Sequence, residues 1–246
     1  SLQMLAQTDP ADWQCYTLPQ DGLDDYFERL PIDGLTIGID PRLVTMTTYD
    51  RFNDSISTAG GRVTALDINP IDAIWHDQPP MPAPSAWRME DAVAGQCVAD
   101  KLQALAENLR QQNVRAALLT RVDSVNWLIN IRGGDLPCTP VNLCFAFFDC
   151  DQGLTLLGDA DRLASISDQN ITVTPLADLP HLLALCAGDA VLVEPASLPQ
   201  SLSFVLAASD VEMVEGACPI TLMKARKNQT EISGFRQAHH HDGVAM

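Results

Sequence analysis

Short apolar runs typical of strands alternate along the chain with segments whose apolar residues recur at helical spacing. This alternation predicts an α/β chain. In the first part, the run at 35–39 is a buried-strand signal, and the run at 63–68 is the next one. Asp40-Pro41 follows the first run, and proline is tolerated in the first turn of a helix. We therefore expect a helix from Pro41 to about Ser57, closed by Gly60-Gly61. Strand, helix and strand with short connections predict a βαβ unit.

The clearest helix signal opens the second part of the chain. Val98, Leu102, Leu105 and Leu109 recur at helical spacing and predict a helix that ends near 112–113. Lys101, Gln103 and Arg110 lie elsewhere on this helix. A strand at 114–120 follows. The apolar segments at 143–148 and 154–157 flank Asp-Gln-Gly and predict a β-hairpin. Further strands are expected at 171–175, 190–194 and 212–215, and further helices at 160–167, 178–187 and 199–208. This order predicts a three-layer α/β domain, and the hairpin makes its sheet mixed.

Residues 69–84 differ in character from both parts. They contain five prolines around a short apolar turn at Ile71, Ile74 and Trp75. Such a composition is typical of an extended linker, partly in polyproline II conformation. We interpret it as a domain boundary.

The segment 123–149 concentrates residues with special backbone requirements. An apolar helical stretch leads into Arg132-Gly133-Gly134-Asp135, and a loop with Pro137 and Pro140 follows. Glycine permits a turn where a Cβ would clash, and proline holds its neighbours extended, so the loop shape is fixed. Arg132 and Asp135 are the candidate residues for a substrate cleft, since a guanidinium fits a carboxylate. They could equally pair with each other or with backbone groups.

Composition restricts the partners of the chain. The net charge is -17, which argues against nucleic acid and against anionic membrane surfaces. Every apolar run is shorter than the roughly 18–20 residues of a membrane helix. The seven scattered cysteines lack a Cys-x-x-Cys pair, and we interpret them as reduced core residues. We expect a cytoplasmic protein.

The residues alone indicate neither a catalytic nor a metal site. Three adjacent imidazoles, His239 to His241, point about 100° apart on a helix and cannot share one metal ion. We expect them to face solvent or to pack against a neighbouring helix. Nucleotide-binding, zinc-peptidase and serine-hydrolase motifs are absent from the sequence. Trp75 and Trp127 are expected to anchor the core or an interface.

The last segment, 219–246, carries a short basic piece at 222–227. Thr230 is expected to cap a helix that starts at Glu231. The chain begins without Met and stops inside this predicted helix. We therefore expect it to be a piece of a longer protein.

Four collinear stretches resemble aminopeptidase P, the Xaa-Pro aminopeptidase of the creatinase/prolidase group. D-S-V-N-W-L-I-N-I-R-G-G-D-L-P-C-T-P-V is similar to the family segment D-x-I-A-W-L-x-N-I-R-G-x-D-x-x-x-x-P-V. Ile39-Asp40-Pro41 resembles its G-x-D-P strand end, and 74–80 resembles its I-W-x-D-R-P-P linker. Residues 222–245 resemble its K-A-x-K-N-x-x-E-x-x-G-M-R-x-A-H-x-x-D-G-x-A entry to the catalytic domain. Departures from the usual residues are Gln78, Gly134 and Phe235.

The resemblance implies an α/β fold made of creatinase N-terminal-like domains, one partial and one complete, plus the first helix of a pita-bread domain. Residues 1–78 would be the C-terminal part of the first domain. Residues 79–218 would be the second, three-layer domain with a mixed sheet. Residues 219–246 would start the catalytic domain.

The resemblance also implies the chemistry of the full-length parent. Two manganese ions, held by two Asp, one His and two Glu, would activate water for hydrolysis of the bond before proline. All five ligands would lie downstream of the segment that resembles 222–245, so this chain would hold no metal, no catalytic residue and no activity of its own. The implied partners are a peptide substrate with proline at its second position and a second copy in a homodimer.

Two alternatives follow from the same resemblance. Relatives that have lost the metal ligands use this scaffold to bind peptides or proteins, so the chain could belong to a binding module. A prolidase is disfavoured, because prolidases generally carry one upstream domain and this chain has parts of two.

Overall fold

The computed structural model describes residues 2–16, 22, 26–27, 30–82, 84–167 and 171–246. The chain divides into two compact units, Ser1–Asp77 and Gln78–Met246. Leu23, Phe27 and Leu30 stand at helical spacing and predict a short helix, which falls mostly outside the described residues.

The first unit contains the predicted βαβ arrangement. Strands β1 (Thr36–Ile39) and β2 (Arg62–Ala65) pair in parallel, and helix α3 (Met46–Thr58) connects them. Two short helices, α1 (Leu2–Gln7) and α4 (Pro70–Ile74), complete the described elements of this unit. Strand β2 ends earlier than the predicted 68, since its partner β1 ends at Ile39, which pairs with Ala65.

The predicted helix start at Pro41 is wrong. Asp40 Oδ1 accepts hydrogen bonds from the Arg42 backbone N–H (2.9 Å) and from Arg42 Nε (3.0 Å), which folds 40–42 into a turn. Helix α3 begins instead at Met46, after Thr45, whose side chain accepts from the Thr48 backbone N–H. An aspartate that hydrogen-bonds the backbone two residues on favours a turn over a helix.

The second unit is built around a six-stranded mixed sheet in the order β10-β9-β4-β6-β7-β8. The hairpin of β6 and β7 is antiparallel, as predicted, and β4 also pairs with β6 antiparallel; the other pairs are parallel. The strands of this sheet are β4 (Ala116–Leu119), β6 (Phe145–Asp149), β7 (Gly153–Leu157), β8 (Ile171–Thr174), β9 (Ala190–Val193) and β10 (Glu212–Glu215). A separate antiparallel pair joins β3 (Trp87–Arg88) to β5 (Ile131–Arg132).

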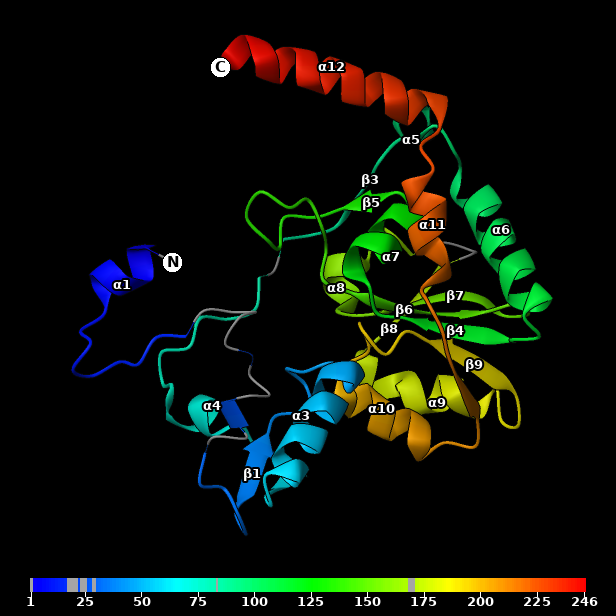
Figure 1. Ribbon diagram of the computed structural model, residues 1–246. Helices are drawn as coiled ribbons and strands as arrows, with labels where there is room; N and C mark the ends of the chain where they lie inside the picture. Colours follow the sequence, from blue (N-terminus) through cyan, green and yellow to red (C-terminus); the bar gives the residue numbers. More distant parts are fainter. Residues whose placement is uncertain (1, 17–21, 23–25, 28–29, 83, 168–170) are drawn as a thin grey trace. The chain divides into compact units, whose positions relative to one another are not determined.

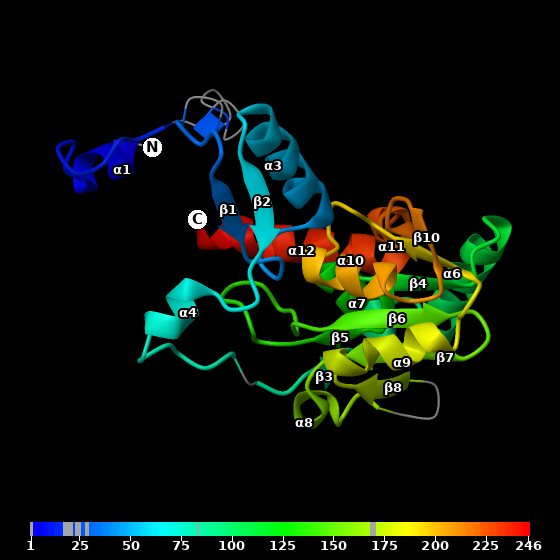
Figure 2. The same cartoon turned by 90° about the horizontal axis from the view of Figure 1, so that it is seen from below.

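Helices cover both faces of this sheet, which gives the predicted three layers. Helices α6, α7 and α11 lie over one face, and α9 and α10 lie over the other (Figures 1 and 2). The helical elements of the second unit are α5 (Asp91–Ala94), α6 (Val98–Gln111), α7 (Val122–Leu128), α8 (Ala160–Leu163), η1 (Leu176–Asp178), α9 (Leu179–Ala184), α10 (Gln200–Ala207), α11 (Pro219–Ala225) and α12 (Gln229–Ala245). The segment predicted as a short basic piece is thus mostly helix α11.

The core confirms the apolar periodicity of α6. Leu105 and Leu109 are fully buried, and they share one apolar cluster with Val125 and Leu128 of α7 and Ala117 of β4. Removing such side chains from water is the main favourable contribution to folding, on the order of 2 kcal/mol for each leucine. Trp127 lies in this core at 9% exposure, whereas Trp75 is 45% exposed and is not a core residue.

Candidate functional site

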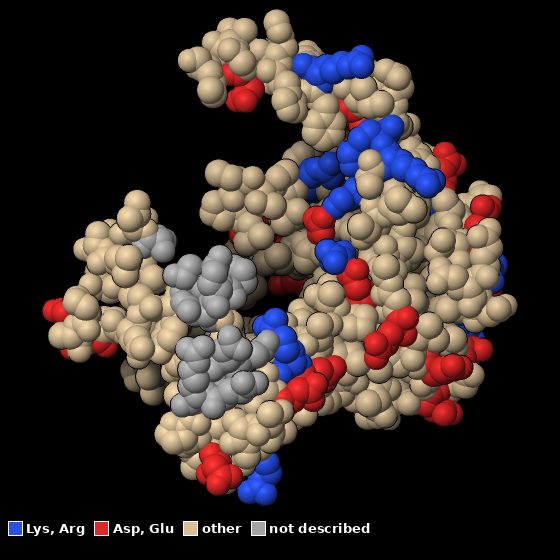
Figure 3. Space-filling view, in the orientation of Figure 1, with Lys and Arg blue, Asp and Glu red and all other residues tan. Residues whose placement is uncertain are grey.

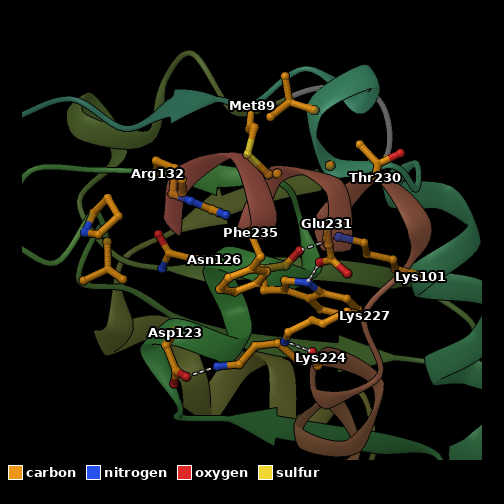
Figure 4. A pocket seen from close by; sticks show the side chains of 17 residues that line it. Met89, Lys101, Asp123, Asn126, Arg132, Lys224, Lys227, Thr230, Glu231 and Phe235 are labelled. Atoms are coloured by element: carbon orange, nitrogen blue, oxygen red, sulfur yellow. Dashed lines mark hydrogen bonds and ion pairs between the residues drawn. The ribbon is translucent and has the colours of Figure 1, made fainter. Parts of the chain in front are cut away.

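The second unit contains a pocket of about 470 Å³ between α7 and the start of α12 (Figure 4). Its walls come from two stretches of the chain that are far apart in sequence, 89–141 and 224–238. The residues that line it are Met89, Val93, Ala94, Lys101, Asp123, Asn126, Trp127, Arg132, Pro140, Val141, Lys224, Lys227, Thr230, Glu231, Gly234, Phe235 and Ala238. The loop around Arg132, which was predicted to have a fixed shape, and the predicted last helix therefore both contribute to one site.

Lys101 lies beneath this pocket and is almost fully buried, at 1% exposure. Its Nζ lies 3.9 Å from the centroid of the Trp127 ring and donates to Trp127 O (2.8 Å) and to Asn130 Oδ1 (2.6 Å). Burial lowers the pKa of the Lys101 ammonium to about 8. Lys101 was expected elsewhere on the helix than the apolar positions, but the structure buries it with them. Lys101 lies three residues after Val98 and four before Leu105, so it shares their face of α6.

Glu231 joins α12 to this arrangement. Trp127 Nε1 donates to Glu231 Oε1 at 3.0 Å, across 104 residues of sequence. Glu231 Oε2 accepts from the Asn228 backbone N–H, and Asn228 Oδ1 accepts from the Glu231 backbone N–H, both at 2.9 Å. This is a capping box, so Asn228, not the predicted Thr230, caps the helix.

Arg132 reaches the pocket from the end of the short strand β5. Its side chain is half-buried, and its Nη1 donates to Ile131 O at 2.7 Å. Burial lowers the pKa of the guanidinium, an effect that the charge of Glu231 opposes. Among the residues that the structure describes, no carboxylate lies within ion-pair distance of Arg132. One of the two predicted cleft residues therefore lines the pocket.

Asp135 lies elsewhere, beneath the loop that follows Arg132. Its carboxylate is buried, accepts from the Leu143 backbone N–H at 2.6 Å and forms an ion pair with Arg162. It does not line the pocket. The structure does not pair Asp135 with Arg132; it places Asp135 where it fixes the loop.

The two arms of that loop approach each other too closely for any residue but glycine at 133. A Cβ on Gly133 would lie 2.7 Å from Asn142 N and 2.7 Å from Val141 O, whereas one on Gly134 would meet only ordinary contacts with Pro84. Asn126 holds the returning arm, because its Nδ2 donates to Asn142 O and its Oδ1 accepts from Asn142 N, both at 2.9 Å. Asn126 thereby shapes the Pro140–Val141 wall of the pocket.

Two lysines, one in the last turn of α11 and one just after that helix, complete the pocket. Lys224 Nζ forms an ion pair with Asp123, and Lys227 Nζ donates to Lys224 O. Burial of Asp123 would raise the pKa of its carboxyl, but the hydrogen bond from Lys224 leaves that pKa lower than usual. In Figure 3, Lys and Arg side chains gather where α11 meets α12, and acidic side chains are spread over the rest of this face.

The described part of the chain contains no cluster of metal-ligating side chains. No three His, Cys, Asp or Glu side chains come close enough there to hold a metal ion. His239, His240 and His241 are exposed on α12. The described helices include none that is long and apolar enough to cross a bilayer. All seven cysteines are free; Cys144, Cys186 and Cys218 are buried, but Cys138 is exposed, contrary to its predicted core position.

The family model of the creatinase/prolidase N-terminal domain matches residues 77–231. The chain belongs to this family. The match begins at the boundary between the two units and reaches Glu231, so it includes most of the pocket. The predicted family and the predicted mixed α/β fold of creatinase N-terminal-like domains are thereby confirmed.

Curated relatives match nearly the whole chain. The protein named "Probable Xaa-Pro aminopeptidase P" of Metarhizium acridum is 28% identical over 257 residues, which cover 94% of this chain and 41% of that protein. The protein of the same name from Chaetomium globosum is 30% identical, over 90% of this chain and 38% of its own length. The chain thus spans about two fifths of the length of these relatives.

A solved structure has the same fold. The X-prolyl aminopeptidase of Caenorhabditis elegans, described as a cytosolic enzyme with a di-nuclear active site, superimposes with a TM-score of 0.77. The match covers 95% of this chain and 38% of that protein, at 23% sequence identity.

Proposed function

We propose that this creatinase/prolidase N-terminal chain is the non-catalytic N-terminal portion of an Xaa-Pro aminopeptidase. The observation that carries this proposal is the collinear similarity to proteins named "Probable Xaa-Pro aminopeptidase P" over 94% of the chain. The chain would release no amino acid by itself. The longer protein would cleave the N-terminal residue from peptides with proline at the second position.

We assign residues 1–78 to the C-terminal part of a first creatinase N-terminal-like domain and 79–218 to a second one. Residues 219–246 would start the catalytic domain. The pocket supports a functional junction at the last boundary, because 89–141 contribute one wall and 224–238 the other. In this assignment the second domain walls the substrate cleft and limits the length of peptide that enters.

Within that cleft, Arg132 and Asp135 have different proposed roles. Arg132 would contact substrate, since its half-buried guanidinium lines the pocket without a carboxylate partner among the described residues. Asp135 would shape the cleft rim through Arg162 and the Leu143 backbone N–H. Neither residue would act in the chemical step.

The remaining properties of the longer protein follow from the same relationship. Hydrolysis would use two manganese ions held downstream of α12, and the protein would act as a homodimer in the cytoplasm. The description of the Caenorhabditis elegans enzyme as cytosolic with a di-nuclear active site supports a two-metal site and this compartment.

Turnover by two lengths of chain tests the proposal. The polypeptide of 246 residues and a version extended through the downstream sequence are each assayed with manganese on Ala-Pro-Ala. We expect proline-directed release of alanine from the extended protein only. If the downstream sequence lacks two Asp, one His and two Glu in the metal-binding order and the extended protein is inactive, the chain belongs to a peptide- or protein-binding module instead.

Arg132→Ala in the extended protein tests the substrate contact. We expect a higher KM with a nearly unchanged melting temperature. An unchanged KM and kcat with a lowered melting temperature would assign Arg132 to packing.

A further inference from the structure

The pocket concentrates positive charge in an acidic protein. Among the described residues, four cationic side chains and two acidic ones line it. The chain as a whole has 15 Lys and Arg against 32 Asp and Glu. A surplus of positive charge in a concave, partly desolvated site attracts anions locally even where the overall charge repels them.

Three of the four cations already have partners in the protein. Lys101 is held by Trp127 O and Asn130 Oδ1. Lys224 is paired with Asp123, and Lys227 donates to Lys224 O. Arg132 differs, because its one described hydrogen bond runs back to Ile131 O and uses Nη1 alone. The guanidinium therefore keeps donors for a ligand.

The surroundings of Arg132 are apolar on one side and polar on the other. Figure 4 shows its side chain near Met89 and Asn126, with Lys224 and Lys227 on the opposite side of Phe235. The Asn126 amide is fully engaged, with Val122 O, Asn142 O and the Asn142 backbone N–H. A ligand in the pocket thus meets the planar guanidinium of Arg132 together with aromatic and aliphatic side chains. Glu231 in the same pocket disfavours groups with several negative charges.

We infer that this pocket binds the C-terminal carboxylate of a short peptide, with Arg132 as the specificity-determining residue. Arg presents parallel N–H groups that match a single carboxylate. The apolar floor of Trp127 and Phe235 suits an apolar side chain next to that carboxylate. The inference deepens the proposed function and rests on it for one point, that the bound peptide is the substrate. Short peptides with a free carboxylate would then be preferred over blocked or longer ones.

Direct binding to the polypeptide as it stands tests the inference without catalysis. Ala-Pro-Leu and its C-terminal amide are titrated into the chain at low ionic strength, and calorimetry gives both Kd values. The net charge of -17 favours the more positive amide, so nonspecific attraction predicts the opposite order from the inference. We expect the free acid to bind on the order of tenfold more tightly, as one charge-assisted bidentate contact allows.

Three variants assign that preference to a residue. Arg132→Gln should abolish the preference for the free acid, and Arg132→Lys should retain part of it. Arg226→Gln is the matched control, since Arg226 is an exposed cation on the neighbouring segment that does not line the pocket. It should leave both Kd values unchanged. Circular dichroism melts show that each variant is folded.

Equal affinity for acid and amide, no binding of either peptide at millimolar concentration, or equal losses in Arg132→Gln and Arg226→Gln would each overturn the inference. Its failure is separate from that of the proposed function. If the extended protein hydrolyses Ala-Pro-Leu and its amide equally well, the proposed function stands and the inference about the carboxylate is overturned. If the chain prefers the free acid but the extended protein hydrolyses neither peptide, the proposed function fails and the carboxylate preference of the pocket stands.

Discussion

The indole Nε1 of Trp127 donates a 3.0 Å hydrogen bond to Glu231 Oε1, and this bond joins α7 to the first turn of α12. The same carboxylate accepts from the Asn228 backbone N–H through its other oxygen. Asn228 in turn donates from Nδ2 to Ala94 O at 2.8 Å, at the end of α5. One carboxylate therefore links the helix cap to the floor of the pocket.

Replacing Glu231 with Ala should loosen α12. The change removes a cap contact and leaves the Trp127 indole without its acceptor, and we expect a loss of about 1–2 kcal/mol in unfolding free energy. Hydrogen exchange of the α12 amides measures it directly and should become faster. Asp242→Ala, at an exposed acid of the same helix, should leave exchange at the first turn unchanged.

Lys101 gives the unfolding free energy a specific dependence on alkaline pH. Burial lowers the pKa of its ammonium to about 8 in the folded protein, against an ordinary value of 10.5. Between these values the unfolded chain binds more protons, so the unfolding free energy rises with pH. Glu231 and Asp91 favour the charged form, and Arg132 opposes it.

The comparison with Lys101→Met isolates this effect. We expect the wild-type protein to gain roughly 1–2 kcal/mol over the variant between pH 7 and pH 9.5. Urea unfolding of both proteins across this range measures the difference. A difference that stays constant with pH would show that the folded protein keeps Lys101 charged up to its ordinary pKa.

Asp135→Asn should destabilise the second unit strongly. The Asp135 side chain is fully buried and that of Arg162 is 12% exposed, so the change leaves a cation without its partner. Breaking such a pair from one side costs about 3–5 kcal/mol. Chemical unfolding followed by circular dichroism measures the loss. Asp151→Asn is the control: its carboxylate is 66% exposed and lies 4.0 Å from Arg115.

Thiol reactivity should separate the cysteines into two classes. Cys138 is exposed in the loop, whereas burial raises the pKa of Cys144 and of Cys186 to about 12. Because the thiolate is the reactive form, we expect Cys138 to react fastest with an aromatic disulfide reagent at pH 8, and Cys144 and Cys186 only on unfolding. Cys138→Ser should remove the fast phase. Mass spectrometry of the labelled peptides identifies each site.

Sequence patterns were sufficient for the layers of the second unit and for its hairpin. The strand at 212–215 matches β10 without a shift. The errors arose where one side chain overrides a general preference. The chain turns at Pro41 because Asp40 accepts a hydrogen bond from Arg42. The tolerance of proline in the first turn of a helix does not indicate that this aspartate favours a turn instead.

The pocket was only partly predictable from the sequence. The glycines and prolines around Arg132 indicated a fixed loop, and Arg132 does line the pocket. Lys101 was not identified as a pocket residue from the sequence. Its position between Val98 and Leu105 in the apolar stripe was the available signal, since a lysine there is expected to be buried and hydrogen-bonded. Asn228 and Glu231 stand at capping-box spacing, which was the available signal for the helix start. Their approach to Trp127 depends on the tertiary fold, which no local pattern contains.

The described hydrogen bonds that anchor helix α12 lie at its start. Its capping box and the contact with Trp127 lie in the first turn, while every residue from 233 to 246 is exposed. A helix of 17 residues is about 25 Å long, so a pivot of about 5° at Asn228 displaces the far end by about 2 Å. The hydrogen bonds of Asn228 and Glu231 in that first turn therefore set the direction in which α12 leaves the pocket.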